Sequence, residues 1–263
     1  MPDDVAPELL VERRDAVALV TLNRPAVRNA LNGSLRASLW REMSALDADD
    51  EIAAVVLTGA DPAFCAGIDL KELGSTSGGL SERGELAITG GARPIPAMSK
   101  PVIGAVGGVA ITGGFELALA CDFLVASERA RFADTHVRVG IQPGWGLTVH
   151  LAQSIGLRRA RELSFTGNFL DAQTALEWGL VNHVVGHAEL VPTALALAAD
   201  IAGNDRAGVA RIRQTYQDGS LGTAADAFAI EGRVSQGWLA NVAGADVEAR
   251  RAAVVERGRD QLG

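Results

Sequence analysis

The stretch PVIGAVGGVAITGGFELALACD, residues Pro101–Asp122, decides the interpretation of the whole chain. Its small and β-branched residues Val102–Val106 predict a buried strand, and its apolar run Phe115–Ala120 predicts a buried helix. The pair Gly113–Gly114 allows a tight turn between the two. Because the first amides of a helix lack internal partners, this turn is a candidate site for an anionic oxygen.

Glu116 stands in the first turn of the predicted helix, among apolar neighbours. The helix dipole alone accounts for an acidic residue there, within an ordinary strand–turn–helix unit. The alternative is a functional carboxylate beside the anion site, since a buried carboxylate needs a partner or a shifted pKa. The residues themselves leave both interpretations open.

The composition is that of a globular protein with 263 residues, 48% of them apolar, which allows one large domain and a smaller appendage. The net charge of −8 argues against nucleic acid as a partner. The acidic N-terminus lacks the pattern of a secretory signal, and the apolar windows are interrupted before they reach membrane-spanning length. We therefore expect a cytoplasmic protein with no membrane partner.

Cys65 and Cys121 lie among apolar or small residues, which predicts reduced, buried thiols. Their spacing matches neither a disulfide framework nor a metal site. We expect no metal and no redox cofactor.

Successive strand-then-helix units in the first half of the chain indicate an α/β architecture with partly parallel strands. Strands are predicted over Ala16–Leu22 and Ile52–Leu57, and helices over Leu147–Ile155 and Ala172–Trp178. The polar, glycine-rich segment Gly74–Gly91 is either a surface loop or a mobile cover over a pocket.

The composition changes near residue 200, where a nearly all-helical tail begins. The expected organisation is a core at residues 1–200 followed by a helical region at residues 201–263.

Four blocks in order resemble the enoyl-CoA hydratase/isomerase (crotonase) superfamily: Asn23–Asn32, Ala63–Leu73, Pro101–Asp122 and Thr166–Val185. The resemblance implies a crotonase-like spiral of strand–strand–helix repeats, with a C-terminal helical region that supports trimerisation. It also implies a homotrimer or a dimer of trimers.

The chemistry implied by the resemblance is stabilisation of the enolate of an acyl-CoA thioester by two backbone amides. Matched by position, the donors of this oxyanion hole are Ile68 and Gly113. Fixed dipoles in a dry site stabilise the charge that develops on the thioester oxygen. Coenzyme A enters as part of the substrate, so no separate cofactor is implied.

The resemblance also assigns residues that bind the substrate. Ala66 and Ile68 face the adenine and pantetheine arms of coenzyme A, and the adjoining residues Asp69, Leu70 and Lys71 extend that binding segment. Arg28 falls where a basic residue meets the coenzyme A phosphates, and the alternative is a solvated surface charge.

Gly144 matches a position near the attacking water, and Trp145 is placed to line the acyl pocket.

Hydratases of this family use two carboxylates, and here only Glu116 is retained, because His136 occupies the second position. His136 either replaces that carboxylate as a proton carrier or packs as a structural residue. Asp134 lies two residues before His136 and could serve beside it if the segment curls.

The leading hypothesis is hydration of a 2-trans-enoyl-CoA to a 3-hydroxyacyl-CoA. The alternatives are double-bond isomerisation, decarboxylation or thioester hydrolysis on the same scaffold, and a non-catalytic acyl-CoA binder.

Overall fold

The computed structural model describes residues 6–69 and 93–220, together with scattered residues between 222 and 234. The chain divides into two units, Met1–Val209 and Ala210–Gly263. The expected boundary at residue 200 stays a prediction. Almost all of the tail beyond residue 220, like the segment Gly74–Gly91, lies outside the described residues.

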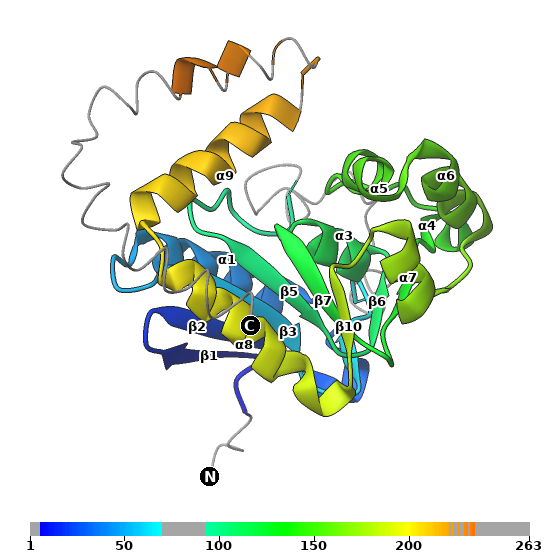
Figure 1. The fold of residues 1–263 in the computed structure, drawn as a ribbon. Coiled ribbons are helices and arrows are strands. Elements are labelled where there is room, and N and C mark those ends of the chain that lie inside the picture. The colour runs from blue at the N-terminus through cyan, green and yellow to red at the C-terminus, as the bar shows by residue number, and fades with distance from the viewer. Residues whose placement is uncertain are drawn as a thin grey trace, which may run out of the picture. The chain divides into compact units, whose positions relative to one another are not determined.

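Within the described residues, the main sheet of the first unit has six strands in the order β1-β2-β3-β5-β7-β10 (Figure 1). Only the β1–β2 pair is antiparallel, and the other neighbours run parallel. The strands are Leu9–Arg14, Val17–Leu22, Ala54–Gly59, Val102–Val106, Phe123–Ser127 and His183–Val185.

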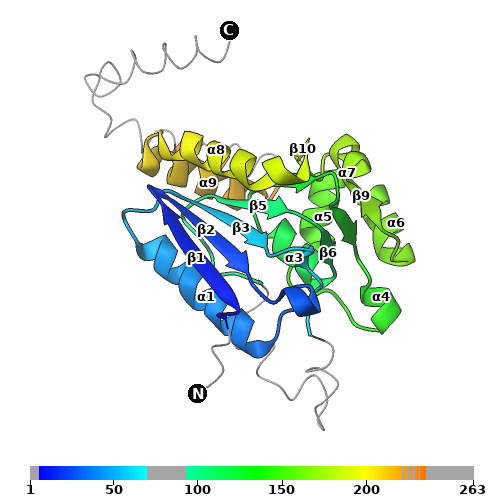
Figure 2. The ribbon, with the colours of Figure 1, turned by 90° about the horizontal axis from the view of Figure 1, so that it is seen from below.

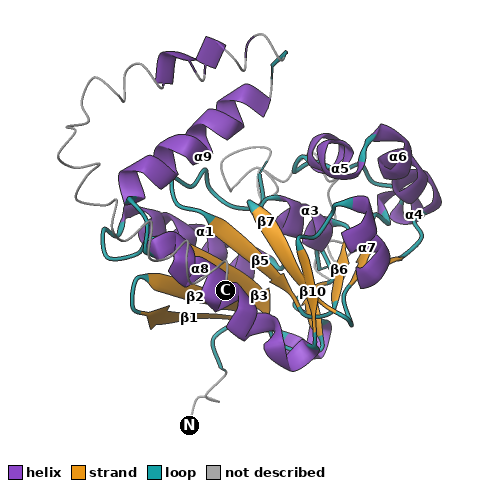
Figure 3. Ribbon diagram, viewed as in Figure 1, coloured by secondary structure: helices purple, strands orange, loops and turns teal. Residues whose placement is uncertain are grey.

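A second sheet has the order β4-β6-β8-β9, and the strands of both sheets are orange in Figure 3. Its strands are Ala63–Cys65, Val109–Ile111, Arg131–Ala133 and Leu170–Asp171. Three successive strand pairs, β3–β4, β5–β6 and β7–β8, each give their first member to the main sheet and their second to the small one. This repetition is the expected spiral.

Two helices cover opposite faces of the main sheet (Figure 2). Leu35, Leu39 and Met43 of α1 join the large core on one face, and Ala194 and Ala198 of α8 join a smaller core on the other. The alternating residues of the strands supply both cores, as a sheet buried on two sides requires.

The described helices are α1 (Gly33–Ala48), α3 (Gly113–Leu119), α4 (His136–Val139), α5 (Leu147–Ile155), α6 (Leu157–Thr166), α7 (Ala172–Trp178), α8 (Leu190–Ala202) and α9 (Arg206–Ser220).

The predicted bounds of α5 and α7 are confirmed, and Asp171 caps α7 by accepting from the Thr174 amide at 2.9 Å. Both cysteines are free and buried, as expected. No helix among the described residues is long and apolar enough to cross a membrane.

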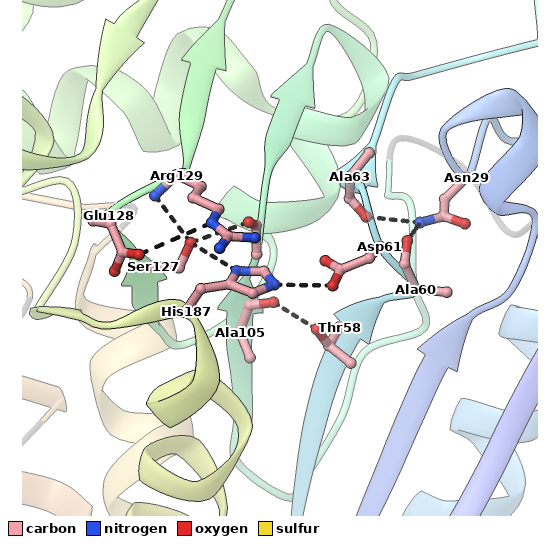
Figure 4. A network of polar contacts seen from close by, with 11 residues as sticks. Asn29, Thr58, Ala60, Asp61, Ala63, Ala105, Ser127, Glu128, Arg129 and His187 are labelled. Atoms are coloured by element: carbon pink, nitrogen blue, oxygen red, sulfur yellow. Dashed lines mark hydrogen bonds and ion pairs between the residues drawn. The ribbon is translucent and has the colours of Figure 1, made fainter.

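Buried polar side chains hold the connections through which the chain leaves the main sheet (Figure 4). Asn29 donates to the carbonyls of Ala60 and Ala63 at 2.8 and 2.7 Å, between β3 and β4. Ser127, at the end of β7, donates to a main-chain carbonyl at 3.0 Å and contacts His187, which pairs with Asp61 at 2.9 Å. Such partners satisfy backbone groups that the ladders leave open.

Candidate active site

Three loops meet at one edge of the small sheet. Its strands β4, β6 and β8 are parallel neighbours, so their carboxyl ends share that edge. Ile68 follows β4, Gly113 follows β6 and His136 follows β8. Ligands of parallel sheets bind beyond the carboxyl ends of the strands, and this topology therefore assembles the predicted residues from distant parts of the chain.

The two predicted oxyanion amides lie side by side. A methyl group built on Gly113 would be 3.5 Å from the Ile68 amide nitrogen and 3.5 Å from the Ile68 side chain. Neither amide donates a hydrogen bond to any of the described residues. Two neighbouring N–H groups without an acceptor among the described residues are what an oxyanion site requires.

Gly67 makes this approach possible. Its φ of +93° is a conformation that glycine adopts without strain. A side chain there would meet the Ile111 carbonyl oxygen at 2.8 Å and the Gly113 nitrogen at 3.3 Å. Gly67 therefore lets the loops after β4 and β6 close onto each other.

Arg24 anchors the segment that carries Ile68. Its guanidinium contacts Asp69 at 3.1 Å, Glu8 at 2.8 Å and the Ala30 carbonyl at 2.5 Å. The Ile68 segment also forms a parallel bridge with Leu31. Arg24 therefore holds this loop, and Asp69, predicted in the substrate-binding segment, takes part in holding it.

Of the other coenzyme A residues, Arg28 is exposed, and its carbonyl accepts from the Ala66 amide at 3.0 Å. This contact places the main chain of Arg28 beside Ala66, and the contact of its side chain with the coenzyme A phosphates stays a prediction. Leu70 and Lys71 lie outside the described residues.

Glu116 is 3% exposed, and main-chain amides of the α4–α5 connection donate hydrogen bonds to it. Its Oε1 accepts from the amides of Trp145 at 2.7 Å and Gly144 at 3.2 Å. Burial raises the pKa of this carboxyl, and the hydrogen bonds and the nearby His136 only partly offset that rise. Glu116 therefore exchanges a proton more readily at neutral pH than a solvated glutamate does.

His136 is 4% exposed and stands between two carboxylates. Its Nδ1 lies 2.6 Å from Asp134 Oδ1, and its Nε2 lies 3.7 Å from Glu116 Oε2. The chain turns into α4 directly after β8, and in this turn Asp134 lies against both the ring and the amide of His136.

The separation of 3.7 Å between His136 Nε2 and Glu116 Oε2 exceeds a hydrogen bond. Two proton-exchanging atoms at this spacing can both contact one small polar molecule, such as water. General acid–base chemistry requires such a pair within reach of the reacting atoms. The geometry therefore joins a proton-handling pair with a candidate oxyanion hole.

Trp145 is 6% exposed, and its ring lies beside the candidate oxyanion site formed by the Ile68 and Gly113 amides. A methyl group on Gly113 would lie 3.2 Å from the edge of this ring. The Arg36 guanidinium lies 5.4 Å from the ring centroid, in cation–π geometry. Trp145 thus contributes both its amide and its ring beside the acid pair, and its contact with an acyl chain stays a prediction.

Within the described residues, no group of three or more His, Cys, Asp and Glu side chains has an arrangement that could hold a metal ion. The contact between Asp134 and His136 has a local signal in the sequence. An aspartate two residues before a histidine can accept from that residue's own amide in an Asx turn, and here it does so at 3.2 Å.

Comparison with known proteins places this site in a family. The family model described as enoyl-CoA hydratase/isomerase matches residues 12–249. A protein of Arabidopsis thaliana, named as a probable peroxisomal enoyl-CoA hydratase 1, is 39% identical over 221 residues, which cover 83% of this chain and 82% of that protein.

Two solved structures extend the comparison. An enoyl-CoA hydratase from Mycobacterium tuberculosis is 46% identical, with a TM-score of 0.75 over 88% of this chain and 98% of its own. One from Bacillus anthracis is 31% identical, with a TM-score of 0.86 over 95% of this chain and 97% of its own. Since the matches span most of the chain in both sequence and fold, this protein belongs to the enoyl-CoA hydratase/isomerase family.

Proposed function

We propose that this protein hydrates 2-trans-enoyl-CoA thioesters to 3-hydroxyacyl-CoA. One observation supports this most strongly. The open amides of Ile68 and Gly113 lie at the same sheet edge as the buried pair Glu116 and His136. Conjugate addition of water needs an oxyanion hole to stabilise the enolate and a nearby pair of groups to move protons.

The substrate binds with its thioester oxygen on the two amides and its conjugated double bond beside the acid pair. Water lies between Glu116 Oε2 and His136 Nε2. Glu116 takes a proton from this water while its oxygen bonds to the β-carbon, and the π electrons move onto the thioester oxygen. The amides stabilise the resulting enolate, and each such donor lowers the activation barrier by about 2.7–4 kcal/mol.

Protonated His136 then delivers its Nε2 proton to the α-carbon, and the enolate collapses to the thioester. The enzyme is left with a protonated Glu116 and a neutral His136. A proton passes from Oε2 to Nε2, through water across the gap of 3.7 Å, and restores the starting state. Water is consumed once and no proton is gained or lost overall.

The remaining features belong to the same proposal. Arg28 pairs with the coenzyme A phosphates, and Trp145 and Ile68 border the acyl group. The reaction uses only groups of the chain and of its substrate, with no resident cofactor. We further propose a cytoplasmic homotrimer or dimer of trimers, which the C-terminal helical region supports through its resemblance to the family.

The test is a hydration assay with purified protein and enoyl-CoA substrates of several chain lengths. We expect the absorbance of the conjugated thioester to fall and the product to gain the mass of one water. A product of unchanged mass with a shifted double bond would show isomerisation instead. Absence of turnover at every chain length would refute the proposal.

A further inference from the structure

We propose that Asp134 is a positioning residue for this reaction, which keeps a proton on His136 Nδ1 and balances the charge of the imidazolium that donates from Nε2. The inference rests on the proposed function and extends it to a residue outside the Glu116–His136 pair. It assigns Asp134 an action through His136, without contact to the substrate.

The contacts of Asp134 converge on a single oxygen. Oδ1 lies 2.6 Å from His136 Nδ1 and accepts from the His136 backbone amide at 3.2 Å. The side chain is almost fully buried, with the residue 1% exposed, and the Ser164 hydroxyl from α6 donates to it as well. The imidazole is therefore held both by its ring and by its own main chain.

The contact between Asp134 and His136 determines which ring nitrogen of His136 carries a proton. Burial raises the pKa of Asp134, but the hydrogen bonds from His136 and Ser164 outweigh this effect and leave the pKa below its ordinary value. Asp134 is therefore ionised at neutral pH and can only accept. A proton must then reside on Nδ1, which leaves Nε2 to exchange its proton on the side of Glu116.

A purely structural role offers a clear alternative. Asp134 could serve only to close the turn into α4 through its bond to the His136 amide. Asparagine performs that task as well as aspartate does. Replacement by asparagine keeps a neutral acceptor for the turn and removes the charge, so it separates the two roles.

The experiment compares Asp134→Asn and Asp134→Ala with the parent enzyme. We expect kcat for enoyl-CoA hydration to fall about 10²-fold or more in Asp134→Ala, by analogy with loss of a residue that orients a catalytic histidine. Asp134→Asn should fall in between, because it keeps the acceptor without the charge. KM should change less than about threefold in both, since Asp134 does not touch the substrate.

A spectroscopic readout reports the ring directly. Nitrogen-15 NMR of histidine-labelled protein distinguishes the two neutral tautomers, and the chain has only 4 histidines. The His136 signal is assigned by its absence in His136→Gln. We expect a proton on Nδ1 in the parent, in the imidazolium and in the neutral ring alike, and in Asp134→Ala a loss of the imidazolium with a shift toward the Nε2–H form.

Asp122→Asn is the matched control. Asp122 lies beyond the other end of α3, and its Oδ2 accepts from the Val102 amide at 2.7 Å, so the same atom exchange is made away from the site. It should leave kcat and the His136 signal unchanged.

The inference is overturned if Asp134→Asn has a kcat within about threefold of the parent, or if Asp134→Ala folds and retains the parent tautomer. If Asp134→Ala does not fold, the asparagine variant alone decides. A parent enzyme without hydration activity would instead contradict the proposed function, and the NMR comparison would still test the Asp134–His136 contact.

Discussion

Replacement of Glu116 by glutamine and by alanine separates its chemistry from its structural role. In the parent, Oε1 accepts two main-chain amides, those of Gly144 and Trp145. Glutamine offers a carbonyl oxygen with the same two lone pairs, so it can keep both bonds. It cannot take a proton from water, and general acid–base contributions are worth about 10²–10⁴-fold in rate.

The two variants should therefore agree in activity and differ in stability. Alanine leaves the buried amide of Trp145 and the part-buried amide of Gly144 without an acceptor. Each orphaned amide costs about 1–3 kcal/mol, with the lower end appropriate for the less buried one. We expect Glu116→Ala to unfold with a free energy about 2–4 kcal/mol below that of Glu116→Gln.

Urea denaturation gives the free energies of unfolding, and the enoyl-thioester absorbance gives kcat for the same preparations. Glu116→Gln should lose at least about 10²-fold in kcat while its unfolding midpoint stays near that of the parent. Equal free energies of unfolding for the two variants would refute the stabilising role of the two hydrogen bonds from the Gly144 and Trp145 amides. Full activity in Glu116→Gln would refute the role of Glu116 as the proton acceptor.

Three further predictions concern the loops that build the site. Gly113→Ala should fold but lose hydration activity, because its methyl group would lie 3.5 Å from the Ile68 amide nitrogen, where the thioester oxygen is proposed to bind. Gly114→Ala should fail to accumulate as folded protein, because its methyl group would lie 2.1 Å from a main-chain oxygen of β4. Circular dichroism and the hydration assay check both variants. Arg24→Met should lower the unfolding free energy by about 2 kcal/mol and reduce kcat, since partly buried carboxylates lose their partner, as urea denaturation and kinetics will measure. The stability deficit of Asp134→Asn should be complete above pH 3.8, the ordinary pKa of the group, and should shrink as the pH falls through the lowered folded-state pKa, in denaturation curves recorded across that range.

Much of the fold could be predicted from periodicity and capping residues. Helices α5 and α7 have strong apolar spacing and clear ends, and their bounds were predicted correctly. The strand β6 was missed because Val109–Ile111 is only three residues long and is surrounded by glycines. A strand that short has no period of its own, and its identity depends on pairing with β4 and β8.

The site was less predictable, because its geometry depends on main-chain placement. The positions of Ile68 and Gly113 came from family resemblance, and no local pattern indicates that two amides 45 positions apart in the chain converge. Asp134 illustrates the opposite case. Its contact with His136 is local, because residues two positions apart share one side of a strand and the chain also turns into α4 directly after β8.

The replacement of a carboxylate by His136 puts a positive charge where related hydratases have a negative one. The negative charge of Asp134 offsets it. Two carboxyl groups side by side share one proton, because like charges in close contact do not both ionise, and the pair has a net charge of −1. Carboxylate, imidazolium and carboxylate in the order Glu116, His136, Asp134 also sum to −1, with opposite charges adjacent. The substituted site therefore presents the substrate with the same net charge and one exchangeable proton. An uncharged residue at position 134 would raise that total to zero, which makes the activity of Asp134→Asn a direct test of whether the charge of the group behind His136 matters to the reaction.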